Sequence, residues 1–265
     1  MNAAIADWIL ERRVNASNHA EVFFARRGGV AAALKLARGG DRPTVLRSAR
    51  EAAALRRIDH PCVAPLLDAG FNADGTPYVA TRWIDGDVLE DRLAAGPMSW
   101  RELAPMLEAL ATGLGALHAA GVVHRDLKPS NVIVPASGDP PAVILDLGHA
   151  ALHGDARITH TGTTVGSLLY MAPEQVRGGA VDGRADLYAL GVMLYRALCG
   201  RVPFASEHVL RGELDLVPAR RRVPELPPAV DDLCRWLLAT KASERLPSAT
   251  VLVATLQSIT MTRVR

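Results

Sequence analysis

The feature that most constrains this chain is a polar octet that lies between two short apolar runs. The octet is His124-Arg125-Asp126-Leu127-Lys128-Pro129-Ser130-Asn131, with Val122-Val123 before it and Val132-Ile133-Val134 after it. Short apolar runs bounded by polar residues predict buried strands, so we expect the octet to be a loop held between two strands. Asp146-Leu147-Gly148 follows downstream. Two carboxylates, a lysine and an amide beside apolar strands have no evident use in packing, which favours a chemical role.

The residue types in this stretch suit phosphoryl transfer. Asp126 can accept a proton from an attacking hydroxyl, and Lys128 can neutralise a phosphoryl group in transfer. Asn131 and Asp146 offer the hard oxygen ligands that Mg²⁺ prefers. The spacing therefore predicts a hydroxyl-orienting acid and a divalent-cation site close to one another.

Length and composition restrict the class of protein. The chain has 265 residues, of which 49% are hydrophobic and 22% charged, as in a soluble globular protein with one large domain or two lobes. A formal net charge of +2 gives no argument for nucleic-acid binding. No run approaches the roughly 18 apolar residues of a membrane span, and the N-terminus lacks a signal-peptide pattern. We expect no membrane contact within this chain and a cytoplasmic location, alone or as the cytoplasmic domain of a longer protein.

Apolar runs and turn-formers predict the order of elements. Strands are expected at residues 8–14, 21–25 and 30–36, with a tight hairpin at Gly28-Gly29. A helix carrying Glu51 is expected over residues 47–58, and a further strand pair runs through 66–67 and 78–80. After Gly86 the pattern predicts mainly helices. The first of these starts at a Ser99–Glu102 capping box and ends near Gly121, and residues 186–195 predict a helix buried almost all round.

The spacing H-R-D-x-K-x-x-N followed by D-x-G resembles the catalytic and metal-binding loops of eukaryotic-type protein kinases. Ala33-Leu34-Lys35 is similar to the A-x-K of the third kinase strand, and residues 166–174 are similar to the G-[ST]-x-x-Y-x-A-P-E end of an activation segment. The resemblance covers essentially the whole chain and is in the style of a bacterial Ser/Thr protein kinase catalytic domain. It implies an α+β, bilobal fold, with a small, mainly β N-lobe at 1–85 that carries one helix and a larger, mainly α C-lobe at 86–265.

The same resemblance implies an activity and its residues. It implies transfer of the γ-phosphoryl group of ATP, with Mg²⁺ or Mn²⁺, to protein hydroxyls, and Lys128 with Ser167 favours Ser/Thr over Tyr. Glu51 is expected to pair with Lys35, which holds the α- and β-phosphates. The other implied nucleotide-binding positions are Val14, Asn15, Ser17, Ala20, Val22, Ala33, Thr81 as gatekeeper, Arg82, Trp83 and Ile84 as hinge, Ile133 and Asp146. The implied structural residues are Arg125, Leu147, Glu174, Asp186 and Arg245, with Asp186 bonded to the catalytic-loop backbone and Arg245 paired with Glu174.

One departure from the family leaves two functions open. Asn15, Ser17 and Ala20 stand where kinases carry three glycines. Their backbone N–H groups are expected to remain as phosphate donors, whereas a non-glycine residue at positive φ costs about 1–2 kcal/mol. We therefore expect an active kinase with a raised KM for ATP. The alternative is a pseudokinase that binds nucleotide or a partner without efficient turnover. A small-molecule phosphotransferase would share the catalytic loop but gives no reason for residues 166–174.

Regulation is predicted at the long segment of residues 150–167, which is rich in Thr, Gly and His. By resemblance, Thr159 and Thr161 carry activating phosphates, with Thr163 and Thr164 as neighbours, and a phosphate there could order the segment through Arg125. A kinase dimer for autophosphorylation is one partner that this implies; the protein substrate is not identified by the sequence. Leu147 replaces the usual phenylalanine of D-F-G and is expected to form a smaller plug beneath the helix that carries Glu51.

Overall fold

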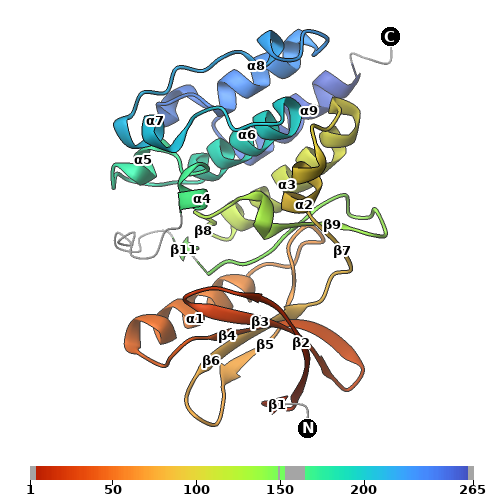
Figure 1. Cartoon of the computed structure of the whole chain (residues 1–265), viewed down its shortest axis with the longest axis vertical. Helices are drawn as coiled ribbons and strands as arrows, with labels where there is room; N and C mark the ends of the chain where they lie inside the picture. The colour runs from red at the N-terminus through yellow and green to blue at the C-terminus, as the bar shows by residue number, and fades with distance from the viewer. Residues whose placement is uncertain (1–3, 149, 153–164, 262–265) are drawn as a thin grey trace.

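A computed structural model of the chain describes residues 4–148, 150–152 and 165–261. It places an antiparallel sheet with one long helix at one end of the molecule and a group of helices at the other (Figure 1). This arrangement confirms the predicted α+β, bilobal fold. None of the helices in the described ranges is long and apolar enough to cross a membrane.

The N-terminal sheet has six strands in the order β1-β2-β3-β4-β6-β5, with every neighbouring pair antiparallel. Gly28 and Gly29 connect β3 to β4 with φ of +54° and +84°, and they form the predicted tight hairpin. The strands are β1 (Ala4–Ile5), β2 (Trp8–Ala16), β3 (Ala20–Arg27), β4 (Val30–Ala37), β5 (Leu66–Phe71) and β6 (Pro77–Arg82).

The two faces of this sheet have different neighbours. Because side chains alternate along a strand, Leu34 and Ala80 point to the outer face, where they belong to a small buried cluster with Trp8. Lys35 and Val79 form the next pair along β4 and β6 and point to the opposite face. Val79 belongs to the large buried cluster that continues into the helical region. The register therefore aims Lys35 at the helical end of the molecule.

The helix that carries Glu51, α1 (Arg42–Leu55), begins and ends earlier than predicted. The prediction of 47–58 followed the alanine-rich interior and missed the start signal. Asp41 caps the helix by accepting a hydrogen bond from Thr44 N at 3.1 Å, and Pro43 lies in the first turn, where its missing N–H has no cost. Glu51 and Leu55 are on the buried face.

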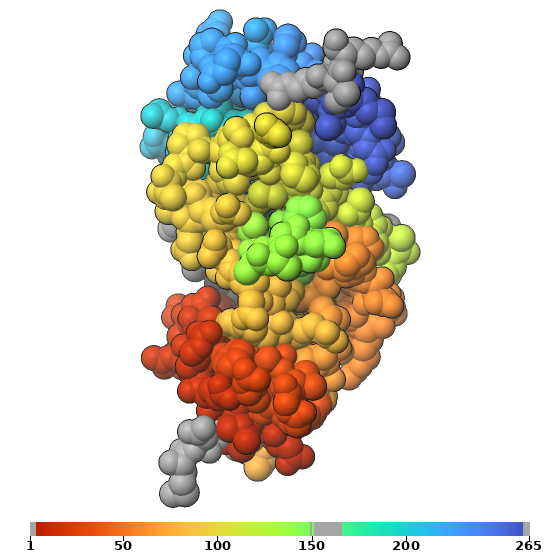
Figure 2. Space-filling view, turned by 90° about the vertical axis from the view of Figure 1, so that its right-hand side faces the viewer, coloured from red at the N-terminus to blue at the C-terminus, as the bar shows by residue number. Residues whose placement is uncertain are grey.

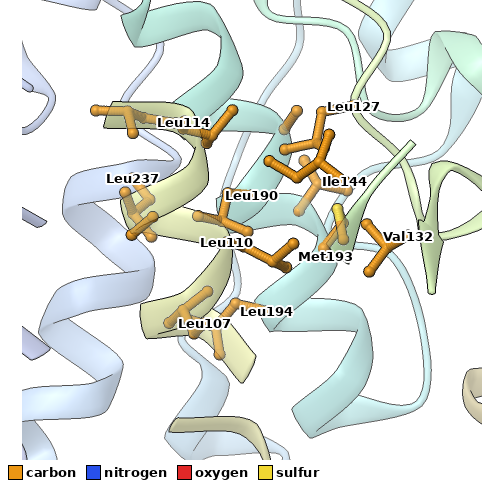
Figure 3. Packing of buried hydrophobic residues seen from close by; sticks show 14 of the residues in the cluster. Leu107, Leu110, Leu114, Leu127, Val132, Ile144, Leu190, Met193, Leu194 and Leu237 are labelled. Carbon is orange, nitrogen blue, oxygen red and sulfur yellow. The ribbon is translucent and has the colours of Figure 1, made fainter. Parts of the chain in front are cut away.

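The helical region is built around α3 (Trp100–Ala119) and α6 (Arg184–Cys199). The predicted capping box is present at the start of α3, where Ser99 Oγ accepts from Glu102 N and the Glu102 carboxylate accepts from Ser99 N. Helix α6 is buried on nearly all sides, as its composition predicted. Figure 3 shows the two helices facing each other, with Leu110 and Leu114 of α3 against Leu190 and Met193 of α6.

The remaining elements connect and cover this core. Short strands β8 (Val122–Val123) and β9 (Val132–Pro135) flank the octet, as predicted; β8 pairs with β11 (Ala151–Leu152), and β9 pairs with β7 (Gly86–Val88) and β10 (Val143–Ile144). The other elements are α2 (Leu89–Ala95), α4 (Val165–Leu168), α5 (Pro173–Val176), α7 (Ser206–Arg211), α8 (Pro228–Leu237), α9 (Ala249–Met261) and the 3₁₀ turns η1 (Pro129–Asn131), η2 (Ala219–Arg221) and η3 (Ala242–Glu244).

Asp68 on β5 joins four strands of the sheet through one carboxylate. Its Oδ2 accepts hydrogen bonds from Trp8 Nε1 at 3.1 Å, from Tyr78 Oη at 3.1 Å and from Arg27 Nη1. The Arg27 guanidinium also lies 4.3 Å from the centre of the Trp8 ring. Partial burial raises the pKa of Asp68, but these donors outweigh it and hold the pKa below its ordinary value.

Replacing Asp68 with Asn should lower the free energy of unfolding at pH 7 by about 1–2 kcal/mol, because three donors lose a charged acceptor. A carboxyl group with a depressed folded-state pKa stabilises fully above its unfolded pKa of about 4 and loses this contribution as pH falls further. Urea unfolding should therefore show a constant difference between pH 5 and 7 that shrinks below about pH 4. Glu11→Gln, which removes an exposed partner of Arg26, is the control and should change little. If the free energies of unfolding of the parent and Asp68→Asn differed by the same amount at every pH, the lowered pKa of Asp68 would be contradicted.

Candidate active site

The first turn of α6 binds the backbone at the start of the octet through hydrogen bonds. Asp186 is 1% exposed, and its carboxylate accepts hydrogen bonds from His124 N and Arg125 N, both at 2.9 Å. His118 Nε2 donates to the same carboxylate at 2.8 Å. Burial raises the pKa of Asp186. The bond from His118 and the other donors around the carboxylate lower the pKa by more than burial raises it, so the net shift is downward. Arg125 has φ of +65°, and Gln175 Nε2 fixes its carbonyl at 2.9 Å.

The acidic and basic side chains of the octet lie together on its open side. Lys128 Nζ donates to Asp126 Oδ2 and to Ser167 Oγ, both at 2.7 Å. Asn131 Nδ2 donates to the carbonyl of Asp126 at 2.8 Å. Lys128 therefore joins the loop to the segment that carries Ser167, a link between two motifs that spacing alone does not show.

Lys35 connects the two ends of the molecule. Its Nζ lies 3.1 Å from Glu51 Oε2 on α1 and 2.5 Å from Asp146 Oδ1, which follows β10. The structure thus contains the expected pair of Lys35 with Glu51 and adds Asp146 to it. Gly148 N also donates to Asp146 Oδ1, at 2.8 Å. One ammonium is shared by two carboxylates from separate segments of the chain.

This shared ammonium sets the charge states of the three groups. Burial raises the pKa of Glu51 to about 7, although Lys35 acts in the opposite direction. Burial lowers the pKa of Lys35, but Asp146 and Glu51 outweigh it and the net shift is upward. For Asp146, burial raises the pKa and Lys35 lowers it by more, so the group is held ionised. The cluster therefore keeps Asp146 negatively charged.

The oxygen atoms expected to hold a divalent cation are compatible with that task. Because Asn131 Nδ2 is turned toward Asp126, the amide oxygen of Asn131 is left as a neutral hard ligand. Leu145 N donates to the carbonyl of Asn131 at 2.8 Å, which places Asp146 directly beside that residue. One carboxylate and one amide suit Mg²⁺, which binds through few protein ligands and retains water. Across the described ranges, no group of three or more His, Cys, Asp or Glu side chains forms an all-protein metal cage.

Strand register brings most of the expected nucleotide-binding residues to one face of the sheet. Val22 pairs with Lys35 across β3 and β4, and Ala33 pairs with Thr81 across β4 and β6. These side chains share the face that is aimed at the helical region. Asn15 continues the same row on β2, Val14 lies at an irregularity of that strand and is 43% exposed, and Ile133 is buried on β9.

The hinge connects β6 to β7, and two of its N–H groups are bonded to neighbouring segments of the sheet. Arg82 N donates to the carbonyl of Pro65 at 2.9 Å, and Trp83 N donates to that of Ala31 at 3.1 Å. Within the described part of the chain, no backbone carbonyl accepts from Ile84 N. Gly86 follows, where a Cβ atom would collide with the carbonyl of Val134.

An aromatic and cationic stack, which the sequence did not indicate, joins this hinge to β2 and β3. The rings of Phe24 and Trp83 pack edge to face with centroids 4.8 Å apart. The Arg12 guanidinium lies 5.1 Å from the Phe24 centroid and 5.2 Å from that of Trp83. Trp83 Nε1 donates to Asp85 Oδ1 at 2.7 Å. The sequence signal for this stack was the position of Phe24, two residues after Val22. Residues two apart on a strand share a face, so Phe24 lies on the same face of the sheet as Val22.

The loop between β2 and β3 carries the N–H groups that were expected to remain as phosphate donors. In the structure Ser17 N donates to the carbonyl of Ala20 at 2.8 Å, and Ala20 N donates to Ser17 Oγ at 3.1 Å, so phosphate binding at these groups stays a prediction. The substituted loop closes on itself because a serine hydroxyl, which glycine lacks, supplies a local acceptor.

A hollow of about 670 Å³ lies away from these groups. It is lined by Arg82, Ile84 and Asp85 of the hinge and by Pro135, Ser137 and Pro140 of the β9–β10 loop, among others, and none of the ionic groups bonded to Lys35 lines it. Figure 2 views the molecule from the side where this loop, in green, lies between the two ends. The candidate active site is therefore defined by its paired charged groups rather than by this hollow.

Glu174 and Arg245 form a buried ion pair in the helical region. Nη1 and Nη2 of Arg245 lie 2.6 and 2.7 Å from the two carboxylate oxygens of Glu174. The Arg245 side chain is fully buried, and it also donates to the carbonyls of Ala239 and Arg184 while stacking over Tyr188. This pair fixes α5, at the end of the Gly166–Glu174 segment, to the start of α6.

Two further expectations have different outcomes. Leu147 is 1% exposed and belongs to the same buried cluster as Leu55 of α1, with Leu66 packed against that cluster. The four threonines expected to carry regulatory phosphates, Thr159, Thr161, Thr163 and Thr164, lie outside the described residues.

In this fold, Lys35 on the N-terminal sheet contacts Asp146, and the octet lies in the helical region. This arrangement is that of the protein kinase class of fold. The family model described as "Protein kinase domain" matches residues 19–256. The chain belongs to this family and, within it, to the eukaryotic-type Ser/Thr kinase domains of bacteria.

Curated relatives support this assignment. The DNA damage-responsive serine/threonine-protein kinase RqkA of Deinococcus radiodurans is 40% identical over 222 residues, covering 78% of this chain and 32% of RqkA. The serine/threonine-protein kinase PknL of Mycobacterium tuberculosis is 33% identical over 227 residues, covering 83% of this chain and 56% of PknL. The serine/threonine-protein kinase PknJ of the same organism is 33% identical over 261 residues, covering 93% of this chain and 44% of PknJ. The chain thus matches about a third to just over half of the length of these relatives.

Replacing Arg245 with Met should lower the free energy of unfolding by about 3 kcal/mol or more, because Glu174 would remain as a poorly solvated charge without its partner. Chemical denaturation monitored by tryptophan fluorescence measures the change. Lys241→Met is the control: Lys241 is 75% exposed and pairs with the exposed Glu244, so its loss should cost under about 1 kcal/mol. Similar losses in the two variants would show that the buried pair has no special role.

Proposed function

We propose that this chain is an ATP-dependent Ser/Thr protein kinase domain. The observation that carries the proposal is the Lys35 ammonium, which is bonded both to Glu51 on α1 and to Asp146 beside the octet. A cation in this position can bind two phosphate groups while a helix on one side and a carboxylate on the other hold it in place. The hinge supplies Ile84 N and the carbonyls around it for adenine, and the row through Val22 and Ala33 supplies its apolar contact.

Side chains of the octet bind and activate the acceptor hydroxyl. Asp126 orients the hydroxyl and accepts its proton, and Lys128, bonded to Asp126 and Ser167, stabilises negative charge on the phosphoryl group in transfer. The amide oxygen of Asn131 and the ionised carboxylate of Asp146 are the residues that would hold Mg²⁺ or Mn²⁺. When bound, such an ion neutralises charge on the phosphate oxygens.

Lobe boundary and regulation are parts of the same proposal. We place the boundary between Asp85 and Gly86, because β6 ends at Arg82 and β7 begins at Gly86. Autophosphorylation of the threonines at 159–164, in a dimer of kinase domains, would add charge close to Arg125 and order the segment. The regulatory device, the protein substrate and the activity of a longer protein all belong to the proposal.

A pseudokinase is the second candidate function, and one observation favours it. The loop between β2 and β3 uses N–H groups of Ser17 and Ala20 for its own hydrogen bonds, which leaves fewer donors for phosphate. The charged groups argue for turnover, since Lys35, Asp126 and Asp146 all keep the chemistry that transfer requires.

Transfer of the γ-phosphoryl group from radiolabelled ATP to a generic protein acceptor tests the two candidates. Lys35→Met and Asp126→Asn should each reduce the rate by at least about 100-fold, because each removes a group that acts on the transition state. Lys241→Met and Asp232→Asn are the matched controls at exposed positions and should retain parental rates. ATP-dependent thermal stabilisation of the parent without any transfer, in either Mg²⁺ or Mn²⁺, would identify a pseudokinase.

Gly148→Ala should reduce transfer by about tenfold or more while leaving the fold intact. A Cβ atom at this position would lie 2.5 Å from Lys35 Nζ and 2.9 Å from Asp146 Oδ1. Both are ends of side chains, so Lys35 would be displaced rather than the backbone. Thermal unfolding should stay near the parental temperature. A variant with full activity would show that the position of Lys35 in the structure is not the one used in transfer.

A further inference from the structure

The turn between β2 and β3 satisfies its own backbone donors. Of the five N–H groups from Ala16 to Ala20, four donate within the segment. Ala16 N donates to Asn15 Oδ1 and Ser17 N to the carbonyl of Ala20, both at 2.8 Å. The N–H groups of His19 and Ala20 converge on one acceptor, Ser17 Oγ, at 3.2 and 3.1 Å.

The base of the turn is fastened to the neighbouring strands. The Glu21 carboxylate lies 2.9 Å from Arg13 Nη1 on β2 and 3.3 Å from Arg38 Nη2, just past β4. Arg38 N also donates to the carbonyl of His19 at 2.7 Å. These contacts anchor the turn, so its conformation does not depend on a bound ligand.

Strand register places the turn next to the ammonium of Lys35. Asn15 pairs with Val22, and Val22 pairs with Lys35, so the three residues form one row across the sheet. The turn projects just beyond this row, and the Lys35 ammonium reaches across to Asp146. A chain of phosphates bound by Lys35 would therefore lie next to the turn.

We propose that the Ser17 hydroxyl competes with the phosphates of ATP for the N–H groups of His19 and Ala20, and that this competition sets the affinity for ATP. Converging backbone N–H groups bind anions, and here a hydroxyl oxygen takes the place of a phosphate oxygen. ATP must displace it before those donors can bind phosphate, whereas adenosine has no phosphate and meets no such competition. The proposal rests on the proposed function, because it assumes that ATP binds at Lys35.

The direction of the effect separates this role from an ordinary structural one. A serine that only stabilises the turn would, on replacement with alanine, loosen the turn and weaken ATP binding. A competing serine gives the opposite result, since alanine removes the competing acceptor and frees two donors. A gain in affinity cannot come from damage to the fold.

Calorimetric titration of the full 265-residue chain with Mg²⁺–ATP and with adenosine tests the proposal. Ser17→Ala should bind ATP about three- to tenfold more tightly than the parent, the factor expected for hydrogen bonds of this kind. Adenosine affinity should stay within about twofold, and KM for ATP should fall with little change in kcat. Ser17→Thr keeps the hydroxyl and should behave as the parent.

Ser137→Ala is the matched control. Ser137 forms the same kind of local bond in the β9–β10 loop, where its Oγ accepts from Asp139 N at 3.4 Å and donates to the Asp139 carbonyl at 3.0 Å. It lies away from Lys35, so ATP affinity should not change. In nucleotide-free protein, amide hydrogen exchange at His19 and Ala20 should be faster in Ser17→Ala than in the parent, which tests the two bonds without any ligand.

The outcomes distinguish failure of this proposal from failure of the function beneath it. Unchanged or weaker ATP binding by Ser17→Ala, with adenosine bound normally, overturns the competition while the nucleotide site stands. Unchanged exchange at His19 and Ala20 also overturns it. If the parent binds neither adenosine nor ATP, the proposed function fails and this proposal fails with it.

Discussion

The buried carboxylate of Asp186 is the constraint on which the geometry of the His124–Asn131 loop depends. It accepts bonds from the N–H groups of His124 and Arg125 and from His118, and it is nearly inaccessible to water. Arg125 has a left-handed backbone conformation that costs roughly 1 kcal/mol or more for a residue with a side chain, so it needs such support. Because α6 is buried on nearly all sides, its first turn cannot shift without moving the core. The position of the His124–Asn131 loop is therefore determined by the packing of the helical region.

Electrostatics connects that region to the sheet. Two carboxylates, Glu51 and Asp146, share the Lys35 ammonium, so the charge state of each group depends on the other two. If α1 moved away, Lys35 would lose one partner and Glu51 would be left without its counter-charge. The position of α1 and the charges around Lys35 are thus coupled, so a change in the position of α1 would alter the surroundings of Asp146.

Short apolar runs predicted that the octet is a loop between two strands, and the resemblance to protein kinases implied the Lys35–Glu51 pair and the fold class. Spacing did not predict contacts that depend on cross-strand register and rotamers, such as the Arg12 stack and the carboxylate of Asp68. Alanine-rich sequence hid the start of α1, where the informative residue was Asp41 as N-cap. For a similar reason, the sequence did not indicate that N–H groups of the β2–β3 loop form local hydrogen bonds. Departure from a glycine pattern shows what a loop has lost but not which new bonds its side chains form.

In the described part of the chain, most buried hydrophobic residues belong to two clusters of very different size, and the helix α1 of the sheet region shares the larger one. Ala52, Ala54 and Leu55 of α1 belong to the large cluster that fills the helical region, whereas the outer face of the sheet has its own cluster of seven residues around Trp8 and Leu34. Small clusters open at lower free energy than large ones. Transient unfolding would therefore release the outer hairpins first and leave α1 docked. A protease would therefore cut the hairpins while Asp126 and Asp146 still kept their positions, so the sheet and the His124–Asn131 loop would lose their structure in separate steps.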